Sequence, residues 1–358
     1  MLIYACISSH GFGHGSRTAS VLTELAALRP GWRLVLSTAL PDSFLKLAFG
    51  SVPFERRLHR WDVGMVQADA LAVDPEATLL ALERLDGELD ARITAEVAWL
   101  RSQRQLLLVL GDVPPPAARI AAALGAPLAW LASFGWDAIY EPCGGALAQR
   151  AEACRELYRQ GDLLLQCPLA LPMPWGLPVQ ELGLTCSRPR FDPPQLRDRL
   201  RLPHERERCV LISFGGLGLA LDPSLLACWP DHVFLGSDPA LATVPNGRVL
   251  PPEVRPLDVM PLVGRLITKA GYSSFCEAFS QGVGIHLVER HGFAEAPVLE
   301  QALRDHGRHR LLRRDQLQAG DWELDQPLQP ARLGPLPVDG AAVAARALVD
   351  LAASREEH

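Results

Sequence analysis

Two histidines and one aspartate stand where their side chains could share one catalytic site. His10 and His14 follow an apolar run at residues 2–8, and Asp112 follows another at residues 105–111. Side chains at the carboxyl ends of parallel strands meet at the edge where open α/β sheets bind ligands. An imidazole, with a pKa of about 6.5, suits general-base chemistry, and a neighbouring carboxylate could fix its tautomer and stabilise its protonated form. Two simpler roles stay open: the histidines could cap their loop, and Asp112, which precedes a proline-rich stretch, could form a turn.

A second stretch, residues 267–279, has the composition of an anion-binding element. It is typical of a short buried strand, a tight turn at Gly271 and a helix that begins at Ser273 or Ser274. The first turn of a helix leaves backbone N–H groups unpaired and carries partial positive charge. The stretch therefore predicts a site for a phosphate or diphosphate. The glycine-rich residues 10–15 offer the same arrangement near the start of the chain.

Charged side chains accompany the second stretch. Lys269, one of only two lysines, lies beside its turn, and Glu277 lies within its helix. Glu277 could accept hydrogen bonds from a ribose diol, or it could close a capping box with Ser274. Arg290, in the charged segment 289–300, could bind phosphate through two parallel hydrogen bonds. The same segment could instead be a solvated loop followed by a helix start.

The glycine spacing argues against two common nucleotide-binding motifs. Gly11, Gly13 and Gly15 form G-x-G-x-G, whereas a dinucleotide fold uses G-x-G-x-x-G and an acidic residue about 20 positions later. Asp42 comes late and follows a proline. No G-K-[ST] follows either glycine-rich segment, which excludes a P-loop. A nicotinamide cofactor is therefore not expected.

The elements that must position these residues alternate between strands and helices. Strands are predicted at residues 2–8, 32–37, 52–57, 105–111 and 127–132, and helices at residues 16–28, 75–101 and 114–124. This alternation predicts an α/β protein with a doubly wound parallel sheet. A strand at residues 209–214 then opens a second half with the same plan and ends in Gly215 and Gly216.

These patterns divide the chain into two Rossmann-like domains. We expect the first at residues 1–167 and the second at residues 207–335. Recurring prolines mark residues 168–206 as the linker between them. A last helix, within residues 336–358, could cross back to the first domain.

Charge and composition exclude several classes of function. The 358-residue chain has a net charge of −6 and no basic run, so nucleic acid is not an expected partner. Its eight cysteines show neither zinc nor disulfide spacing. No apolar run reaches the ~18–20 residues that span a bilayer, and no leader precedes the first strand. We expect a cytoplasmic protein, with peripheral membrane contact left open.

Taken together, the motifs resemble nucleotide-sugar glycosyltransferases of the GT-B fold, in which two Rossmann-like domains face each other across a cleft. The resemblance rests on His10-Gly-Phe-Gly-His14, Asp112, Gly215-Gly216, Gly271-Tyr-Ser-Ser-Phe-Cys-Glu277 and the segment 289–300. It concerns the MurG-like and UDP-glycosyltransferase group. It extends to the glycosyltransferase-like N-terminal region of arabinokinases, which shares the His-Gly-Phe-Gly-His start.

The resemblance implies an acceptor site in the first domain and a nucleotide-sugar donor site mainly in the second. His14 would deprotonate the acceptor, with Asp112 orienting it and His10 as a second candidate for catalysis. Ser273 and Ser274 would bind the diphosphate, and Glu277 the ribose. The other expected donor-site residues are Gly13, Gly215, Gly216, Leu250 beside the base, Lys269, Gly271, Tyr272, Arg290, Glu295 and Glu300. Glu295 and Glu300 stand where many relatives have an acid–amide pair that touches the sugar.

The implied reaction moves a sugar from a nucleotide diphosphate sugar, with UDP as the expected nucleotide, to a small-molecule, lipid or polysaccharide acceptor. Neither a metal nor another cofactor is expected, because a helix start and serine hydroxyls can stabilise a leaving diphosphate. A hydrolase or epimerase of the same fold, or a non-catalytic sugar-nucleotide-binding module, are the alternatives. Trp61, Phe134, Trp136 and Tyr140 could stack on an acceptor sugar or could simply pack.

Overall fold

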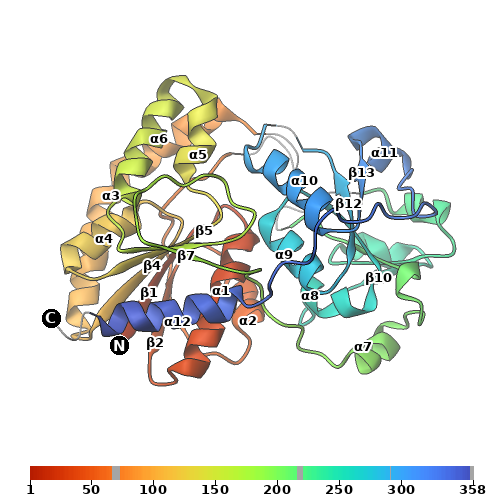
Figure 1. Ribbon diagram of the computed structural model, residues 1–358, viewed down its shortest axis with the longest axis horizontal. Coiled ribbons are helices and arrows are strands. Elements are labelled where there is room, and N and C mark those ends of the chain that lie inside the picture. The colour runs from red at the N-terminus through yellow and green to blue at the C-terminus, as the bar shows by residue number, and fades with distance from the viewer. Residues whose placement is uncertain (67–72, 216–220, 291, 355–358) are drawn as a thin grey trace.

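Figure 1 shows two α/β domains side by side in the computed structural model, which describes residues 1–66, 73–215, 221–290 and 292–354. Each domain is built around one parallel sheet, which confirms the predicted fold class. In the part of the chain that the structure describes, no helix combines the length and apolar character that a membrane span requires.

The first domain contains a seven-stranded sheet in the order β3-β2-β1-β4-β5-β6-β7. Its strands are β1 (Leu2–Ile7), β2 (Arg33–Ser37), β3 (Glu55–Arg57), β4 (Leu107–Asp112), β5 (Leu128–Ala132), β6 (Leu163–Gln166) and β7 (Val179–Glu181). Every side chain of β1 is buried, as expected for an apolar strand that is covered on both faces. The strand order reverses between β1 and β4, so Asp112, the last residue of β4, stands where doubly wound sheets bind ligands.

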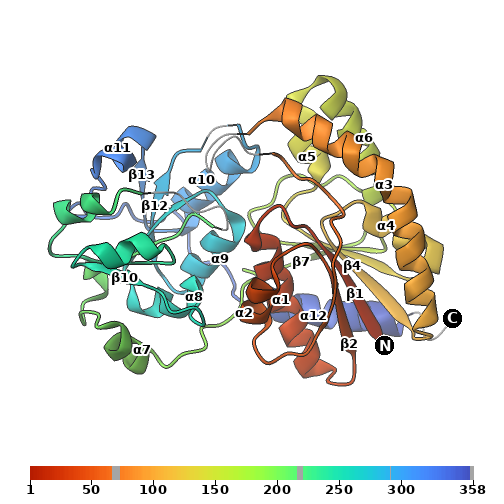
Figure 2. The ribbon, with the colours of Figure 1, turned by 180° about the vertical axis from the view of Figure 1, so that it is seen from behind.

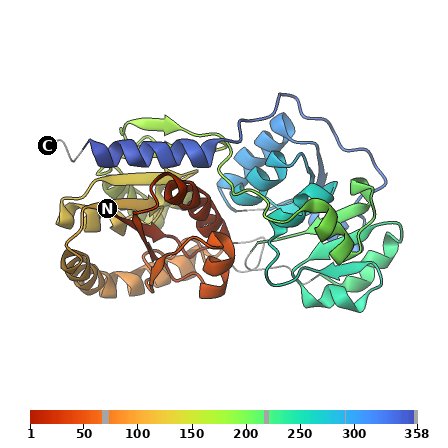
Figure 3. The same ribbon diagram turned by 90° about the horizontal axis from the view of Figure 1, so that it is seen from below.

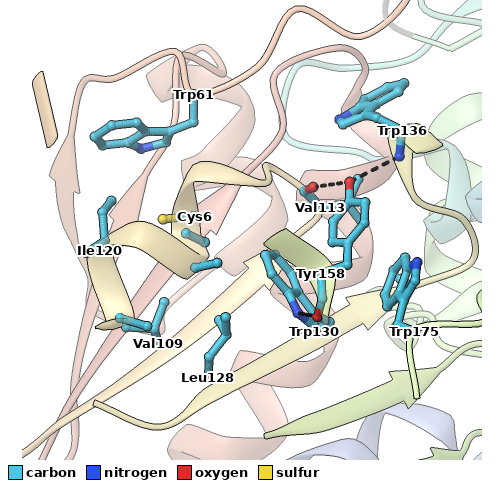
Figure 4. Close-up of a cluster of buried hydrophobic side chains, with 14 of the residues drawn as sticks. Cys6, Trp61, Val109, Val113, Ile120, Leu128, Trp130, Trp136, Tyr158 and Trp175 are labelled. Carbon is cyan, nitrogen blue, oxygen red and sulfur yellow. Dashed lines mark hydrogen bonds between the residues drawn. The ribbon is translucent and has the colours of Figure 1, made fainter. Parts of the chain in front are cut away.

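Helices cover both faces of this sheet. They are α1 (Phe12–Leu28), α2 (Asp42–Phe49), α3 (Pro75–Ser102), α4 (Pro116–Leu124), α5 (Trp136–Tyr140) and α6 (Gly145–Tyr158). Figure 4 shows part of the core on one face, where Trp130, Tyr158 and Trp175 pack together. The Tyr158 hydroxyl donates to the carbonyl of Val113 (2.8 Å) and accepts from the amide of Trp136 (3.0 Å). The core thus ties the chain after β4 to the chain after β5, and both flank the candidate site.

The second domain contains a six-stranded sheet in the order β10-β9-β8-β11-β12-β13. Its strands are β8 (Cys209–Ile212), β9 (Val233–Gly236), β10 (Gly247–Val249), β11 (Arg265–Lys269), β12 (Gly284–Val288) and β13 (His309–Leu312), and its helices are α7 (Pro193–Leu200), α8 (Pro256–Val259), α9 (Tyr272–Ser280), α10 (Glu295–His306) and α11 (Arg314–Ala319). The strand order reverses between β8 and β11. Helix α9 follows β11 and therefore begins at the switch point of the second sheet.

Two segments join the domains. β7 lies within residues 168–206, where the sequence predicts a linker, yet it pairs with β6 at the edge of the first sheet. Helix α12 (Gly340–Ala353) returns from the second domain and packs along α1, as Figures 2 and 3 show. The amide of Leu184 donates to the carbonyl of Pro337 (2.7 Å), so the two crossing segments are bonded to each other.

The helices at both glycine-rich segments begin earlier than the sequence predicts. Helix α1 starts at Phe12, after Gly11, and α9 starts at Tyr272, after Gly271. Gly13 therefore lies inside a helix and not in a loop. Neither helix start has a side-chain cap, so the unpaired N–H groups of both first turns are left for another partner.

Candidate active site

The first domain contributes a buried imidazole–carboxylate pair. His14 lies in the first turn of α1, and its Nδ1 is 2.8 Å from Oδ1 of Asp112 at the end of β4. His14 is 8% exposed and Asp112 is fully buried. Burial by itself raises the pKa of Asp112, but Arg17 and His14 together lower it below its ordinary value. The carboxylate is therefore ionised and can orient the imidazole.

Arg17 completes this pair, and the sequence reasoning missed it. It lies three residues after His14, on the same face of α1. Its guanidinium contacts both carboxylate oxygens of Asp112, with Nε donating to Oδ2 at 3.1 Å, and it also donates to Ser133 Oγ at 2.9 Å. Thr18 donates a further hydrogen bond to Asp112 Oδ2 at 2.7 Å. The helical spacing of Arg17 from His14 was the one signal available in the sequence.

His10 lies near the same site but in a different environment. Its ring makes an edge-to-face contact with Trp136 and stacks on Phe293, at centroid distances of 5.3 and 6.3 Å. Burial, with smaller contributions from His14 and Arg290, lowers the pKa of His10 to about 3. The ring is therefore neutral and a weak base at neutral pH, which favours His14 for that role.

The second domain contributes the start of α9, which reaches across to α1. Ser273 Oγ donates to the carbonyl of Gly13 at 2.9 Å. A Cβ atom at Gly13 would lie 3.1 Å from Ser273 Oγ, so the absence of a side chain allows this close approach. Tyr272 and Cys276 of α9 are buried among apolar side chains of the first domain, and Arg17 lies over the Tyr272 ring at 5.3 Å. Tyr272 is thus part of the domain contact.

A cavity of about 150 Å³, here called the inner cavity, lies between these groups. His10, His14, Arg17 and Phe134 line it from the first domain. Its lining from the second domain comprises Phe214, Gly215, Thr268, Lys269, Ala270, Gly271, Tyr272, Ser273, Ser274, Arg290, Phe293 and Glu295. The imidazole of one domain and the bare helix start of the other therefore share one space.

A larger space of about 940 Å³, here called the outer groove, continues from the inner cavity. Gly13, Gly215, Ser273 and Ser274 line both. The groove extends along the carboxyl ends of β8, β9 and β10 to Leu250, and Glu277 also lines it. A diphosphate at the shared residues would thus have a sugar on one side and a nucleoside on the other.

Glu277 does not close a capping box, because α9 begins at Tyr272 and places this glutamate in its second turn. Its side chain is half-buried and faces the outer groove. Burial raises the pKa of Glu277 to about 7. The carboxylate is available to a ligand, as the ribose-binding prediction requires.

Arg290 and Glu295 both face the inner cavity. Arg290 donates to the carbonyl of Ala270 at 3.3 Å and lies over the Phe293 ring at 4.1 Å. Glu295 is 4% exposed and accepts from Ser133 Oγ at 3.4 Å across the domain boundary. Burial raises the pKa of Glu295, against the opposing effect of Arg17 and His14.

Some predicted residues are not brought to the site. Glu300 pairs with Arg304 at 2.6 Å along α10 and lines neither space, because it lies more than a turn beyond Glu295. Gly216 lies outside the described residues. The described residues include no group of three or more metal-ligating side chains.

Of the two roles left open for the four aromatic residues, stacking on a sugar or simple packing, three of the four residues pack. Trp61, Trp136 and Tyr140 are each 1% exposed and belong to the core. Trp136 donates to Asp62 Oδ2 at 2.8 Å and Tyr140 to the carbonyl of Gly64 at 3.0 Å, so their polar atoms are also used internally. Phe134 alone reaches the inner cavity.

No family model matches the chain. Over 361 residues it is 29% identical to an L-arabinokinase of Arabidopsis thaliana. The aligned region covers 98% of this chain and 34% of the relative. The chain thus spans about a third of the length of the curated relative that it matches.

Solved structures share the whole architecture. UGT2 of Phytolacca americana, complexed with UDP-2-fluoro-glucose and pterostilbene, superposes with a TM-score of 0.60 at 14% identity, covering 99% of this chain and 94% of that chain. UGT89C1 of Arabidopsis thaliana, complexed with quercetin, gives a TM-score of 0.61 at 15% identity, covering 99% and 93%. Likeness at this level of identity concerns the fold, and the chain accordingly has the GT-B fold.

Proposed function

We propose that this chain is a glycosyltransferase that moves a sugar from a UDP-linked donor to an acceptor hydroxyl. One observation carries the proposal: the His14–Asp112 pair of the first domain faces the bare start of α9 across one cavity. A base and an anion-binding helix start on opposite sides of a cleft are what acceptor activation and diphosphate departure each need. The fold neighbours support the choice of donor, since UGT2 was solved with UDP-2-fluoro-glucose and UGT89C1 with UDP-L-rhamnose.

His14 is the base in this proposal. Asp112 accepts a hydrogen bond from the protonated Nδ1, which leaves the lone pair of Nε2 free to take a proton. The acceptor oxygen gives its proton to Nε2 as it bonds to the anomeric carbon of the sugar, while the bond from that carbon to the diphosphate breaks. A positioned base of this kind contributes ~10²–10⁴ in rate. Asp112 stabilises the imidazolium that results.

The two connected spaces divide the donor between them. The uridine occupies the outer groove, with its base beside Leu250 and its ribose hydroxyls donating to Glu277. The diphosphate lies at Ser273 and Ser274, which line both spaces. The sugar then enters the inner cavity, where Glu295 and His14 face it.

We infer that the departing diphosphate is stabilised by the protein without a metal or another cofactor. The start of α9 offers unpaired N–H groups and partial positive charge. Lys269 at the end of β11 adds a full charge on the side of the inner cavity. Both lie where negative charge develops in the transition state, which is the arrangement that lowers a barrier most.

Release of UDP from UDP-sugars, measured with and without an extract of candidate acceptors, tests the proposal. A transferase releases UDP only when acceptor is added, and addition of EDTA leaves the rate unchanged. UDP release that is independent of acceptor indicates a hydrolase. A thermal-shift comparison of UDP, GDP, dTDP and CMP should show the largest stabilisation with UDP, and the absence of any nucleotide effect would remove the donor site altogether.

A further inference from the structure

Arg290 lines the inner cavity and has no hydrogen-bonded anionic partner among the described residues. It follows β12 (Gly284–Val288), and its guanidinium lies 4.1 Å from the centre of the Phe293 ring. Its hydrogen bond to the Ala270 carbonyl, at 3.3 Å, goes to a neutral group. Its Nε is buried and has no hydrogen-bond partner among the described residues. A buried donor without a partner is unfavourable, and a bound ligand would remove this cost.

The carboxylates near Arg290 do not supply that partner. Glu295, which also lines the inner cavity, accepts from Ser133. Its charge opposes the effect of burial on the pKa of Arg290, but no hydrogen bond joins the two side chains. Asp112 is occupied by His14, Arg17 and Thr18. Arg17 is thereby hydrogen-bonded to a carboxylate, whereas Arg290 has no hydrogen-bonded carboxylate among the described residues.

The position of Arg290 separates it from the diphosphate. In the proposed function the diphosphate lies at the residues common to both spaces, which are Phe12, Gly13, Phe214, Gly215, Ser273 and Ser274. Arg290 lines the inner cavity alone, on the side of Phe293 and Glu295. The start of α9 already serves the diphosphate in the proposed function, and Lys269, like Arg290, lines the inner cavity and not the outer groove. Arg290 therefore faces the group beyond it, which is the sugar.

We propose that the transferred sugar carries a carboxylate, as in a uronic acid, and that Arg290 recognises it. The proposal rests on the proposed function, because it assigns the sugar of the same donor. The planar guanidinium, held by Phe293 and Ala270, presents its remaining donors as a fork that fits a carboxylate through two parallel hydrogen bonds. A neutral hexose offers only hydroxyls at this place and leaves the charge of Arg290 unmatched.

Isothermal titration of the full chain with UDP, UDP-glucose and UDP-glucuronate tests this assignment. The unchanged protein should bind UDP-glucuronate about 10- to 100-fold more tightly than UDP-glucose, the range of a charge-assisted hydrogen-bonded pair. Arg290→Gln should abolish that preference and leave the affinity for UDP unchanged. Arg290→Lys, which keeps the charge but not the fork, should retain only part of it. Arg304→Gln, on the α10 face that carries Glu300, is the matched control and should keep the full preference.

Three results would overturn the inference. The first is equal affinity of the unchanged protein for the two UDP-sugars. This measurement does not depend on whether any variant folds. The second is a loss of UDP affinity in Arg290→Gln as large as the loss of UDP-glucuronate affinity, which would place the diphosphate on Arg290. The third is no binding of UDP or of either UDP-sugar. That result also removes the proposed function, whereas the first two leave it standing.

Discussion

At the scale of single residues, the site depends on the three side chains that donate hydrogen bonds to the buried carboxylate of Asp112. Asp112 accepts from His14, Arg17 and Thr18, and all four groups are buried. Burial by itself raises the pKa of Asp112, and Arg17 and His14 together more than compensate for it. Arg17 is therefore a positioning residue: it holds the carboxylate that holds His14.

Replacing Arg17 tests that dependence. Arg17→Met should lower the free energy of unfolding by ~3–5 kcal/mol, because it leaves Asp112 as a buried charge with one cationic partner removed. Arg33→Met is the control, since the Arg33–Glu55 pair is more than a third exposed on both sides and should contribute at most ~1 kcal/mol. Urea denaturation measures both. An equal decrease in the free energy of unfolding in both variants would mean that the Arg17–Asp112 pair contributes no more to stability than an exposed ion pair.

Glu277 gives the site a pH dependence of its own. Burial raises its pKa to about 7, so the carboxylate is mostly protonated at pH 6 and mostly ionised at pH 8. A ribose diol donates more strongly to the ionised form, so UDP-glucose affinity should rise with pH, by up to about tenfold between pH 6 and 8. The diphosphate of UDP-glucose, unlike that of UDP, does not titrate in this range.

Glu277→Gln should bind UDP-glucose more weakly than the unchanged protein at pH 8 and show no rise over the same range. Titration calorimetry at three pH values measures both proteins. A rise of the same size in the variant would assign the pH dependence to another group.

At the scale of elements, the site is made by two helix starts that follow glycines. Helices α1 and α9 both begin without a side-chain cap, and each follows a strand at the switch point of its sheet. The first presents His14 and the second presents backbone N–H groups. Their separation is set by the Ser273–Gly13 hydrogen bond.

A charge placed at the start of α9 separates helix stability from ligand binding. Ser274→Glu should leave the melting temperature unchanged or raise it, because a negative side chain favours a helix N-terminus by ~0.3–1 kcal/mol. The same charge should repel the diphosphate and reduce UDP affinity by at least about tenfold. Thermal unfolding and UDP titration on one preparation measure the two effects. Undiminished UDP affinity would place the diphosphate elsewhere.

The same elements show which parts of the site can be predicted from the sequence. Apolar runs followed by glycine predict β1 and β11 and the anion-binding start of α9, because these depend on local composition. The start of α1 is predicted four residues late, because its glycines resemble a loop, although one of them, Gly13, allows the close approach of Ser273. Arg17 and the burial of Trp136 are not predictable in this way, since both depend on partners about 74 to 116 residues away along the chain.

At the scale of the whole molecule, the fold brings together two groups of residues, one from each domain, around the inner cavity. The first domain carries His14, the proposed base, and the second carries the start of α9, the proposed anion site, each at the switch point of its sheet. The chain crosses between the domains twice, and a hydrogen bond from the amide of Leu184 to the carbonyl of Pro337 joins the two crossing segments. Helix α12 packs back onto α1, the helix that carries His14.

The measurement that tests this account most directly compares His14→Ala with the unchanged protein in two assays on one preparation. Acceptor-dependent UDP release should fall by ~10²–10⁴, because the proposed base is lost, while the dissociation constant for UDP should stay the same, because α9 is untouched. Turnover that survives the substitution would contradict this role of His14, since the other imidazole among the described residues that line the inner cavity, His10, has a pKa lowered to about 3.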